Sequence, residues 1–167
     1  MKFVRPLFFT YTCVLVAGLA ITGLAQAQPS VGDKITLPEV SLINNETQTA
    51  ENTQDKATII HYWATWCPFC LKQNANVQAL YEQSKNTDLQ ILTVSTDDST
   101  SEVKNYLAEH NYDFPVTMQS PALDAVFGKP TTVPTIFVVT ENGEIAEIIP
   151  GLMSEKDFMK LVDYTPN

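Results

Sequence analysis

The chain has 167 residues, 44% of them hydrophobic and 17% charged, and a formal net charge of −9 at pH 7. A chain of this length can bury the core of one domain without disulfide staples. Its acidity disfavours nucleic acid and anionic lipid as partners, because both carry the same sign of charge.

The first predicted element is an export signal in residues 1–27. Lys2 and Arg5 precede an apolar stretch from Leu7 to Ala25, and Ala25-Gln26-Ala27 has the small residues of a cleavage site. The stretch approaches the length of about 20 residues that a membrane helix needs, so an uncleaved anchor is the alternative. Cleavage leaves residues 28–167, which we expect to form a single domain with eight basic and 19 acidic residues.

Two elements are predicted before the cysteines and one directly after the first of them. An alternating patch from Ile35 to Ile43 favours a short hairpin, and the continuous β-branched and aromatic run Ala57–Trp63 is typical of a buried central strand. A helix is expected from Pro68 to about Lys85, with Pro68 where its missing N–H costs nothing. Its apolar residues recur at largely helical spacing: Leu71, Val77, Leu80 and Tyr81. Cys67 therefore lies where a strand meets a helix.

The second half of the chain alternates in the same way. The expected strands are Leu89–Thr96, a short extended piece at Phe114–Met118, and the pair Thr135–Thr140 and Glu144–Ile149. Glu141-Asn142-Gly143 joins that pair as a hairpin, with Asn-Gly as the signal. The expected helices begin at Ser99, run from Pro121 to Phe127, and begin at Ser154. This order predicts an α/β fold in which a central mixed β-sheet is flanked by helices on both faces.

The cysteines indicate the chemistry. Cys13 lies inside the signal, so the mature chain keeps only Cys67 and Cys70, in the sequence Trp66-Cys67-Pro68-Phe69-Cys70. A close pair of this kind is typical of thiol–disulfide exchange. A zinc site with His61 and His110 and an inert structural bridge are the alternatives, although zinc usually needs four ligands and so short a loop stabilises little.

The arrangement resembles the thioredoxin superfamily and, within it, the exported reductases typified by TlpA and ResA. Residues 62–70, Tyr-Trp-Ala-Thr-Trp-Cys-Pro-Phe-Cys, are similar to that group's active-site signature, and Thr132-Val133-Pro134-Thr135 is similar to its second active-site loop. Gly143 and Gly151 fall where the family carries glycines. The Pro-Phe dipeptide between the cysteines and the histidine at position 61 depart from cytosolic thioredoxins, which have Gly-Pro and a buried acid there.

The resemblance implies a thioredoxin fold and a role for each residue of the site. Cys67 is expected to be the nucleophile, because the first turn of a helix favours its thiolate, and Cys70 to resolve the mixed disulfide. Trp66, Val133 and Pro134 are expected to bind the client, and the Val133–Pro134 peptide bond to be cis. Plain packing of Trp66 and an ordinary trans proline are the alternatives.

His61 shares strand parity with Ile59 and Trp63, so the three side chains are expected on one side of the sheet. Beneath the active site, an imidazole could relay the proton of Cys70. A hydrogen-bonded core histidine without a kinetic role is the alternative.

The function that the resemblance implies is that of a periplasmic protein-disulfide reductase. It would take electrons from a membrane thiol donor and reduce exported proteins, such as apocytochrome c or an oxidised repair enzyme, with no metal and no small-molecule cofactor. The alternatives are an oxidant that forms disulfides and a non-catalytic redox, haem or metal-binding chaperone on the same fold. The direction depends on how stable the reduced form is.

Overall fold

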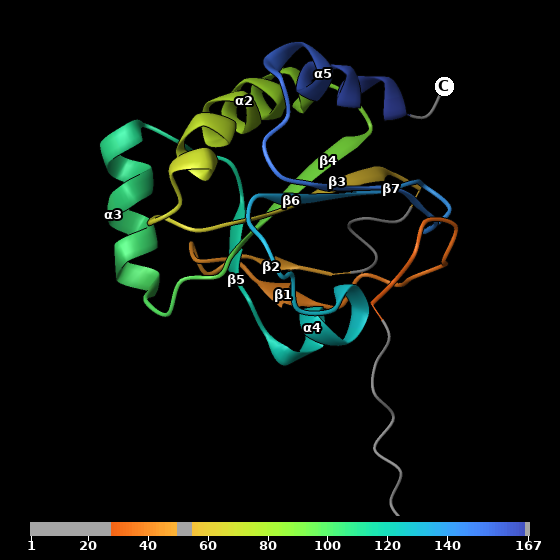
Figure 1. Ribbon diagram of the computed structural model, residues 1–167, viewed down its shortest axis with the longest axis horizontal. Coiled ribbons are helices and arrows are strands. Elements are labelled where there is room, and N and C mark those ends of the chain that lie inside the picture. Colours follow the sequence, from red (N-terminus) through yellow and green to blue (C-terminus); the bar gives the residue numbers. More distant parts are fainter. Residues whose placement is uncertain (1–27, 50–54, 166–167) are drawn as a thin grey trace, which may run out of the picture.

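The computed structural model describes residues 28–49 and 55–165, so the predicted signal in residues 1–27 lies outside the described residues. Its centre is a five-stranded sheet in the order β5-β4-β3-β6-β7 (Figure 1). The strands are β3 (Ala57–Trp63), β4 (Leu89–Ser95), β5 (Val116–Met118), β6 (Thr135–Val139) and β7 (Ile145–Pro150). β3 pairs in parallel with β4 and antiparallel with β6, which confirms the predicted mixed sheet.

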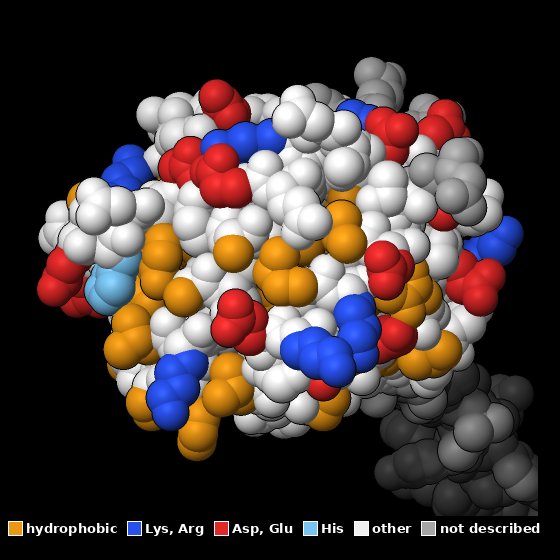
Figure 2. All heavy atoms as spheres, turned by 90° about the horizontal axis from the view of Figure 1, so that it is seen from above, with side chains coloured by type: hydrophobic (Ala, Val, Ile, Leu, Met, Phe, Trp, Pro, Cys, Tyr) orange, Lys and Arg blue, Asp and Glu red, His pale blue; other side chains and the backbone are white. Residues whose placement is uncertain are grey.

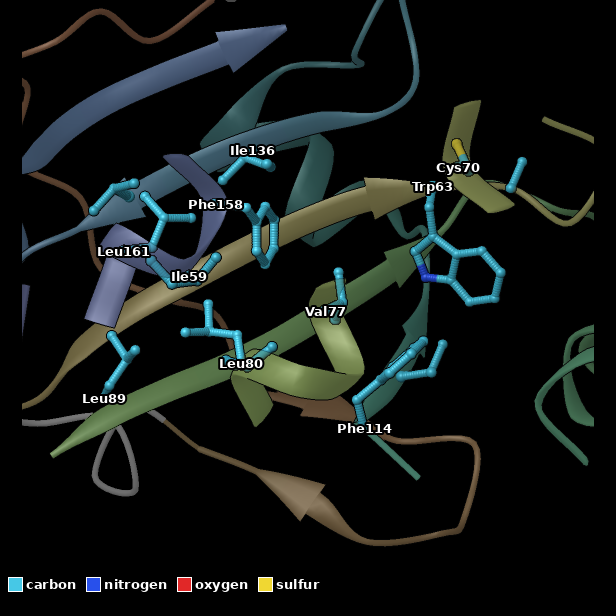
Figure 3. Packing of buried hydrophobic residues seen from close by; sticks show 14 of the residues in the cluster. Ile59, Trp63, Cys70, Val77, Leu80, Leu89, Phe114, Ile136, Phe158 and Leu161 are labelled. Atoms are coloured by element: carbon cyan, nitrogen blue, oxygen red, sulfur yellow. The ribbon is translucent and has the colours of Figure 1, made fainter. Parts of the chain in front are cut away.

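Strand β3 is buried along its whole length because the sheet is covered on both faces. On one face, Ile59 and Trp63 pack with Val77 and Leu80 of helix α2 (Pro68–Ser84) (Figure 3). Burying an aliphatic side chain of this size stabilises the fold by about 1.5–3 kcal/mol. On the other face, Ile60 packs in a second core with helix α4 (Pro121–Phe127).

Three helical elements share the face with α2. Helix α3 (Thr100–His110) contributes Val103, and helix α5 (Glu155–Met159) with the 3-10 turn η1 (Lys160–Tyr164) contributes Phe158 and Leu161. Ser99, Ser120 and Ser154 cap α3, α4 and α5 by accepting a backbone N–H with their hydroxyls. The four predicted helices are confirmed, with α5 shorter than expected because the chain tightens into the 3-10 turn.

Two details of the predicted pattern are wrong. Leu71, expected on the inner face of α2, is 45% exposed, and the polar Gln73 and Asn74 are buried on that face instead. The first hairpin forms later than the apolar patch suggests, because β1 (Val40–Ser41) pairs with β2 (Thr47–Gln48).

The segment before β3 crosses the molecule and closes both edges of the sheet. At the β7 edge, Ile145 donates its N–H to the Asp33 carbonyl at 2.9 Å, and Ile35 donates to the Gly143 carbonyl at 2.8 Å. At the β5 edge, Ile43 donates to the Val116 carbonyl at 2.9 Å. Gly143 has a φ of +75°, and a β-carbon there would come within 2.7 Å of the Ile35 carbonyl oxygen, so this crossing requires a glycine.

None of the helices formed by the described residues is both long and apolar enough to cross a membrane.

Candidate active site at the start of helix α2

Cys67 is the N-cap of helix α2. Its backbone is extended, with φ −91° and ψ 115°, and its sulfur accepts the backbone N–H of Cys70 at 3.3 Å. Pro68 follows at the first helical position, where a missing N–H leaves no hydrogen bond unmade. The first turn of α2 carries no acidic side chain, so the positive end of the helix dipole acts on the Cys67 sulfur unopposed by its own helix.

Cys70 lies one turn along α2 and is fully buried beside Trp63 at the end of β3 (Figure 3). Burial raises the pKa of its thiol far above the ordinary value, and hydrogen bonding with Cys67 raises it further, while the Ala64 backbone opposes both. Cys67 and Cys70 are not joined in a disulfide, so the structure represents the dithiol form. The two thiols differ in environment: Cys67 caps a helix and keeps 4% of its surface exposed, whereas Cys70 is fully enclosed by the core.

The loop before β6 meets Cys67 from the opposite side. The Cys67 thiol donates to the Val133 carbonyl oxygen at 3.5 Å, and the peptide bond between Val133 and Pro134 is cis. Pro134 is buried and accepts the N–H of Gly151 at 2.7 Å, which ties this loop to the end of β7. Three of the residues expected at the site, Cys67, Val133 and Pro134, are thus brought together from distant parts of the chain.

Trp66 and Phe69 project from the same corner, with 69% and 56% of their surface exposed. A groove of about 640 Å³ runs from Trp66 past Val133 and is also lined by the β4–α3 loop and the start of α4. Figure 2 shows the face that carries α2 and α5, where hydrophobic side chains form a broken band between acidic and basic ones. Exposed aromatic surface next to a buried reactive thiol is suited to docking an extended apolar segment.

His61 is fully buried on the α2 side of the sheet and has polar partners there. Its Nε2 lies 3.0 Å from Asn74 Oδ1, and Asn74 in turn donates to the Tyr106 hydroxyl at 3.2 Å. Because an amide oxygen only accepts, this arrangement puts the imidazole proton on Nε2. Nδ1 is then a free lone pair, and it has no hydrogen-bond partner in the structure. Asn74 is one helical turn beyond Cys70, so this hydrogen bond ties His61 to the same helix that carries the buried thiol.

Burial lowers the pKa of His61 from 6.5 to about 4, and the hydrogen bond that His61 donates to Asn74 only partly offsets this. The imidazole is therefore neutral in the folded protein near pH 7. In the unfolded chain it takes up a proton below about pH 6.5, which the folded protein does not do until about pH 4. The free energy of unfolding must fall as the pH drops through this window.

We expect this loss to be on the order of 2 kcal/mol between pH 7 and pH 5, where the carboxylates stay ionised. Urea unfolding of the wild type and of His61→Asn at both pH values measures it, and the variant should show a much smaller difference. His110→Gln, at a half-exposed histidine, is the matched control. Equal pH dependence in the wild type and His61→Asn would contradict the buried neutral imidazole.

Asp97 and Gln73 belong to the site but were missed from the sequence. The Asp97 carboxylate accepts from the backbone and hydroxyl of Thr65, and the Gln73 amide oxygen accepts the N–H of Met153 at 2.8 Å. Asp97 follows strand β4, whose carboxyl end lies beside that of β3 in a parallel pair, and this was a usable signal. Gln73 gave no such signal, because its partner is 80 residues away.

Within residues 28–49 and 55–165, no group of three or more His, Cys, Asp or Glu side chains is placed to hold a metal ion. In particular, His61 bonds to Asn74, and His110 bonds through Nδ1 to the Tyr106 carbonyl. The zinc alternative therefore has no ligand set in the part of the chain that the structure describes.

Comparison with known proteins places these features in a family. The Redoxin family model matches residues 27–163. Thiol-disulfide oxidoreductase ResA of Bacillus subtilis is 25% identical over 174 residues, covering 97% of this chain and 96% of that protein. Sporulation thiol-disulfide oxidoreductase A of the same organism is 29% identical over 141 residues, covering 79% and 81%.

Solved structures share the fold. A thiol:disulfide interchange protein of Chlorobium tepidum superimposes with a TM-score of 0.69 at 24% identity, covering 83% of this chain and 97% of the other. StoA of Bacillus subtilis gives a TM-score of 0.67 at 23% identity, covering 78% and 99%. The likeness confirms the predicted thioredoxin fold.

Proposed function

The chain belongs to the Redoxin family and to its TlpA/ResA-like branch of thiol-disulfide oxidoreductases, and from this premise we infer that Cys67 and Cys70 are its redox-active pair. The observation that carries the inference is the Cys67 sulfur, which caps α2 through the Cys70 N–H and lies 3.5 Å from the Val133 carbonyl. Backbone N–H groups and a helix dipole that act on a sulfur favour its attacking, ionised form.

The exchange then runs in two balanced steps. The Cys67 thiolate attacks one sulfur of a client disulfide, forming a mixed disulfide and releasing a client thiolate, which takes up a proton. The Cys70 sulfur, having given up its proton, attacks the Cys67 sulfur and releases the second client thiolate. Two electrons and two protons pass to the client, and the protein is left with a Cys67–Cys70 disulfide. A dithiol donor must reduce that disulfide before the next turnover.

We propose that the net direction is reduction of exported proteins. The pKa of Cys70 is raised by burial, so the reduced protein gains little from ionising this thiol. A reduced form that is not stabilised as a thiolate makes a dithiol a better reductant, whereas strong oxidants stabilise their reduced form. The names of the ResA and StoA relatives support the chemistry but specify neither clients nor direction.

The remaining assignments follow from this proposal. Residues 1–27 would be the export signal or an anchor that places residues 28–167 in the periplasm, near a membrane thiol donor. Trp66, Val133 and Pro134 would bind the client strand beside Cys67. His61 would exchange the proton of Cys70, supported by its free Nδ1 and by its bond to the residue one turn beyond that thiol. Unchanged exchange rates in both His61→Ala and His61→Asn would remove the relay role.

Two measurements test the function. The dithiothreitol-reduced protein is expected to accelerate insulin reduction, and its potential against glutathione should be more negative than about −200 mV. A potential near that of DsbA, at about −120 mV, would instead select the oxidant alternative. No acceleration and no reversible Cys67–Cys70 disulfide would select the non-catalytic chaperone.

A further inference from the structure

Asp97 is a nearly buried carboxylate, 9% exposed, in the loop between β4 and α3. It accepts three kinds of donor: the Thr65 backbone N–H at 3.0 Å, the Thr65 hydroxyl at 2.7 Å and the Ser95 hydroxyl at 2.7 Å. None of these donors is a cation, so its negative charge is held by hydrogen bonds rather than neutralised by an ion pair. Burying such a charge is costly, and the loop keeps it beside the cysteine-bearing turn.

The donors show which part of the chain Asp97 holds. Thr65 lies in the short turn between β3 and the N-cap Cys67, and Cys67 itself donates to the Ala64 carbonyl at 3.3 Å. The same loop makes a second hydrogen bond to this region, because Thr96 donates its N–H to the carbonyl of Trp63, the last residue of β3, at 2.9 Å. Asp97 therefore fixes the turn from which Cys67 is presented.

The carboxylate is also close enough to act on the buried thiol. Its negative charge is one of the causes that raise the pKa of Cys70. The other ionisable groups around this corner are Asp98 of the same loop, Asp124 of α4 and Lys129, which line the groove. On the α2 side of the sheet they are His61 of β3, whose pKa is lowered by burial, and Tyr106 of α3, whose pKa is raised mainly by burial. Among the groove carboxylates, Asp97 is the one bonded to the cysteine-bearing turn.

We propose that Asp97 is a positioning residue of the dithiol: through Thr65 it fixes the turn from which Cys67 is presented, and its carboxylate lies beside the pair, where it sets the pH range in which Cys70 resolves the mixed disulfide. The proposal rests on the thiol exchange inferred above. The role of Asp97 extends that exchange, because one carboxylate then sets both the shape of the turn and the pH range in which the two cysteines react.

The test is the pH dependence, from pH 5 to pH 11, of the second step of exchange with oxidised glutathione, in which the Cys70 thiol releases glutathione from its mixed disulfide with Cys67. Asp97→Asn keeps the size of the side chain and an acceptor for Thr65 but removes the charge. We expect the midpoint of the profile to move to lower pH by about one unit, a tenfold change in the ionisation constant of the thiol. Asp88→Asn, at an exposed carboxylate just before β4, removes the same formal charge at the opposite end of the strand and should leave the midpoint unchanged.

Ser95→Ala is the second variant and keeps the proposal testable if Asp97→Asn does not fold. It removes one donor from the carboxylate but leaves the charge, so the midpoint should move to higher pH by a smaller amount. If the role of Asp97 were only structural, Asp97→Asn would unfold at a lower temperature, but the midpoints of Asp97→Asn and Ser95→Ala would equal that of the wild type. That result would overturn the proposal. A wild type that does not react with glutathione at all would instead remove the thiol exchange on which it rests.

Discussion

Cys67→Ser is expected to reduce the rate of insulin reduction to the uncatalysed level, a loss of about a thousandfold or more. A serine hydroxyl neither ionises near neutral pH nor forms a disulfide, so the first step cannot occur. The fold should survive, because serine is a preferred N-cap and its hydroxyl can accept the same Cys70 N–H. The turbidity assay for insulin reduction measures the rate, and urea unfolding measures the stability.

Cys67→Ala is the matched control for that experiment. It removes the thiol and also the cap, so it should be equally inactive and less stable than Cys67→Ser by about 1 kcal/mol. The pair of variants separates the chemistry of the sulfur from its structural role at the start of α2. Residual insulin reduction at more than a few per cent of the wild-type rate in either variant would rule out Cys67 as the nucleophile.

Cys70→Ser is expected to stop turnover but to leave the first step intact. Cys67 can still attack a client disulfide, and without the second thiol the mixed disulfide has no internal route to resolution. Covalent adducts of the protein with its clients should therefore accumulate, and they should disappear on adding dithiothreitol. Non-reducing electrophoresis and mass spectrometry of the adducts measure this and identify the donor and the clients.

The control for trapping is the double variant Cys67→Ser, Cys70→Ser, which should give no adducts. The burial of Cys70 is central to the expectation, because a fully enclosed thiol cannot itself be reached by a protein client. Adducts that form through residue 70 in a Cys67→Ser background would show that the roles of the two cysteines are reversed.

The sequence predicted the parts of the fold that depend on local pattern. β3 is a continuous apolar run with one histidine, α3 and α5 begin at capping serines, and Asn142-Gly143 marks a turn, so these elements appear where expected. The turn is a three-residue loop, Glu141-Asn142-Gly143, as the predicted strand bounds imply, and Gly143 is its residue of positive φ. Cys67 and Cys70 were found in the same way, because their spacing is itself the signal.

The sequence could not predict contacts between residues far apart in the chain. Gln73 is buried because its amide accepts the N–H of Met153, and Asn74 because it joins His61 to Tyr106. Periodicity assigns such polar positions to solvent and assigns Leu71 to the core, which is the reverse of what is found. Asp97 differs, because its place just after β4 was a usable signal, but its bonding partner Thr65 lies 32 residues earlier and could not be read from the sequence.

The chain segment that crosses beneath the sheet has a further consequence for how the protein meets other molecules. Because Asp33 pairs with one edge of the sheet and Ile43 with the other, another polypeptide has less exposed backbone at these edges with which to extend the sheet. The Val133 carbonyl, which we propose binds the client backbone, lies instead 3.5 Å from the Cys67 sulfur. Under the proposed function, main-chain pairing with a client would be directed to the cysteines, and the covered edges would reduce the chance that a partly folded client adds its own strands to the sheet.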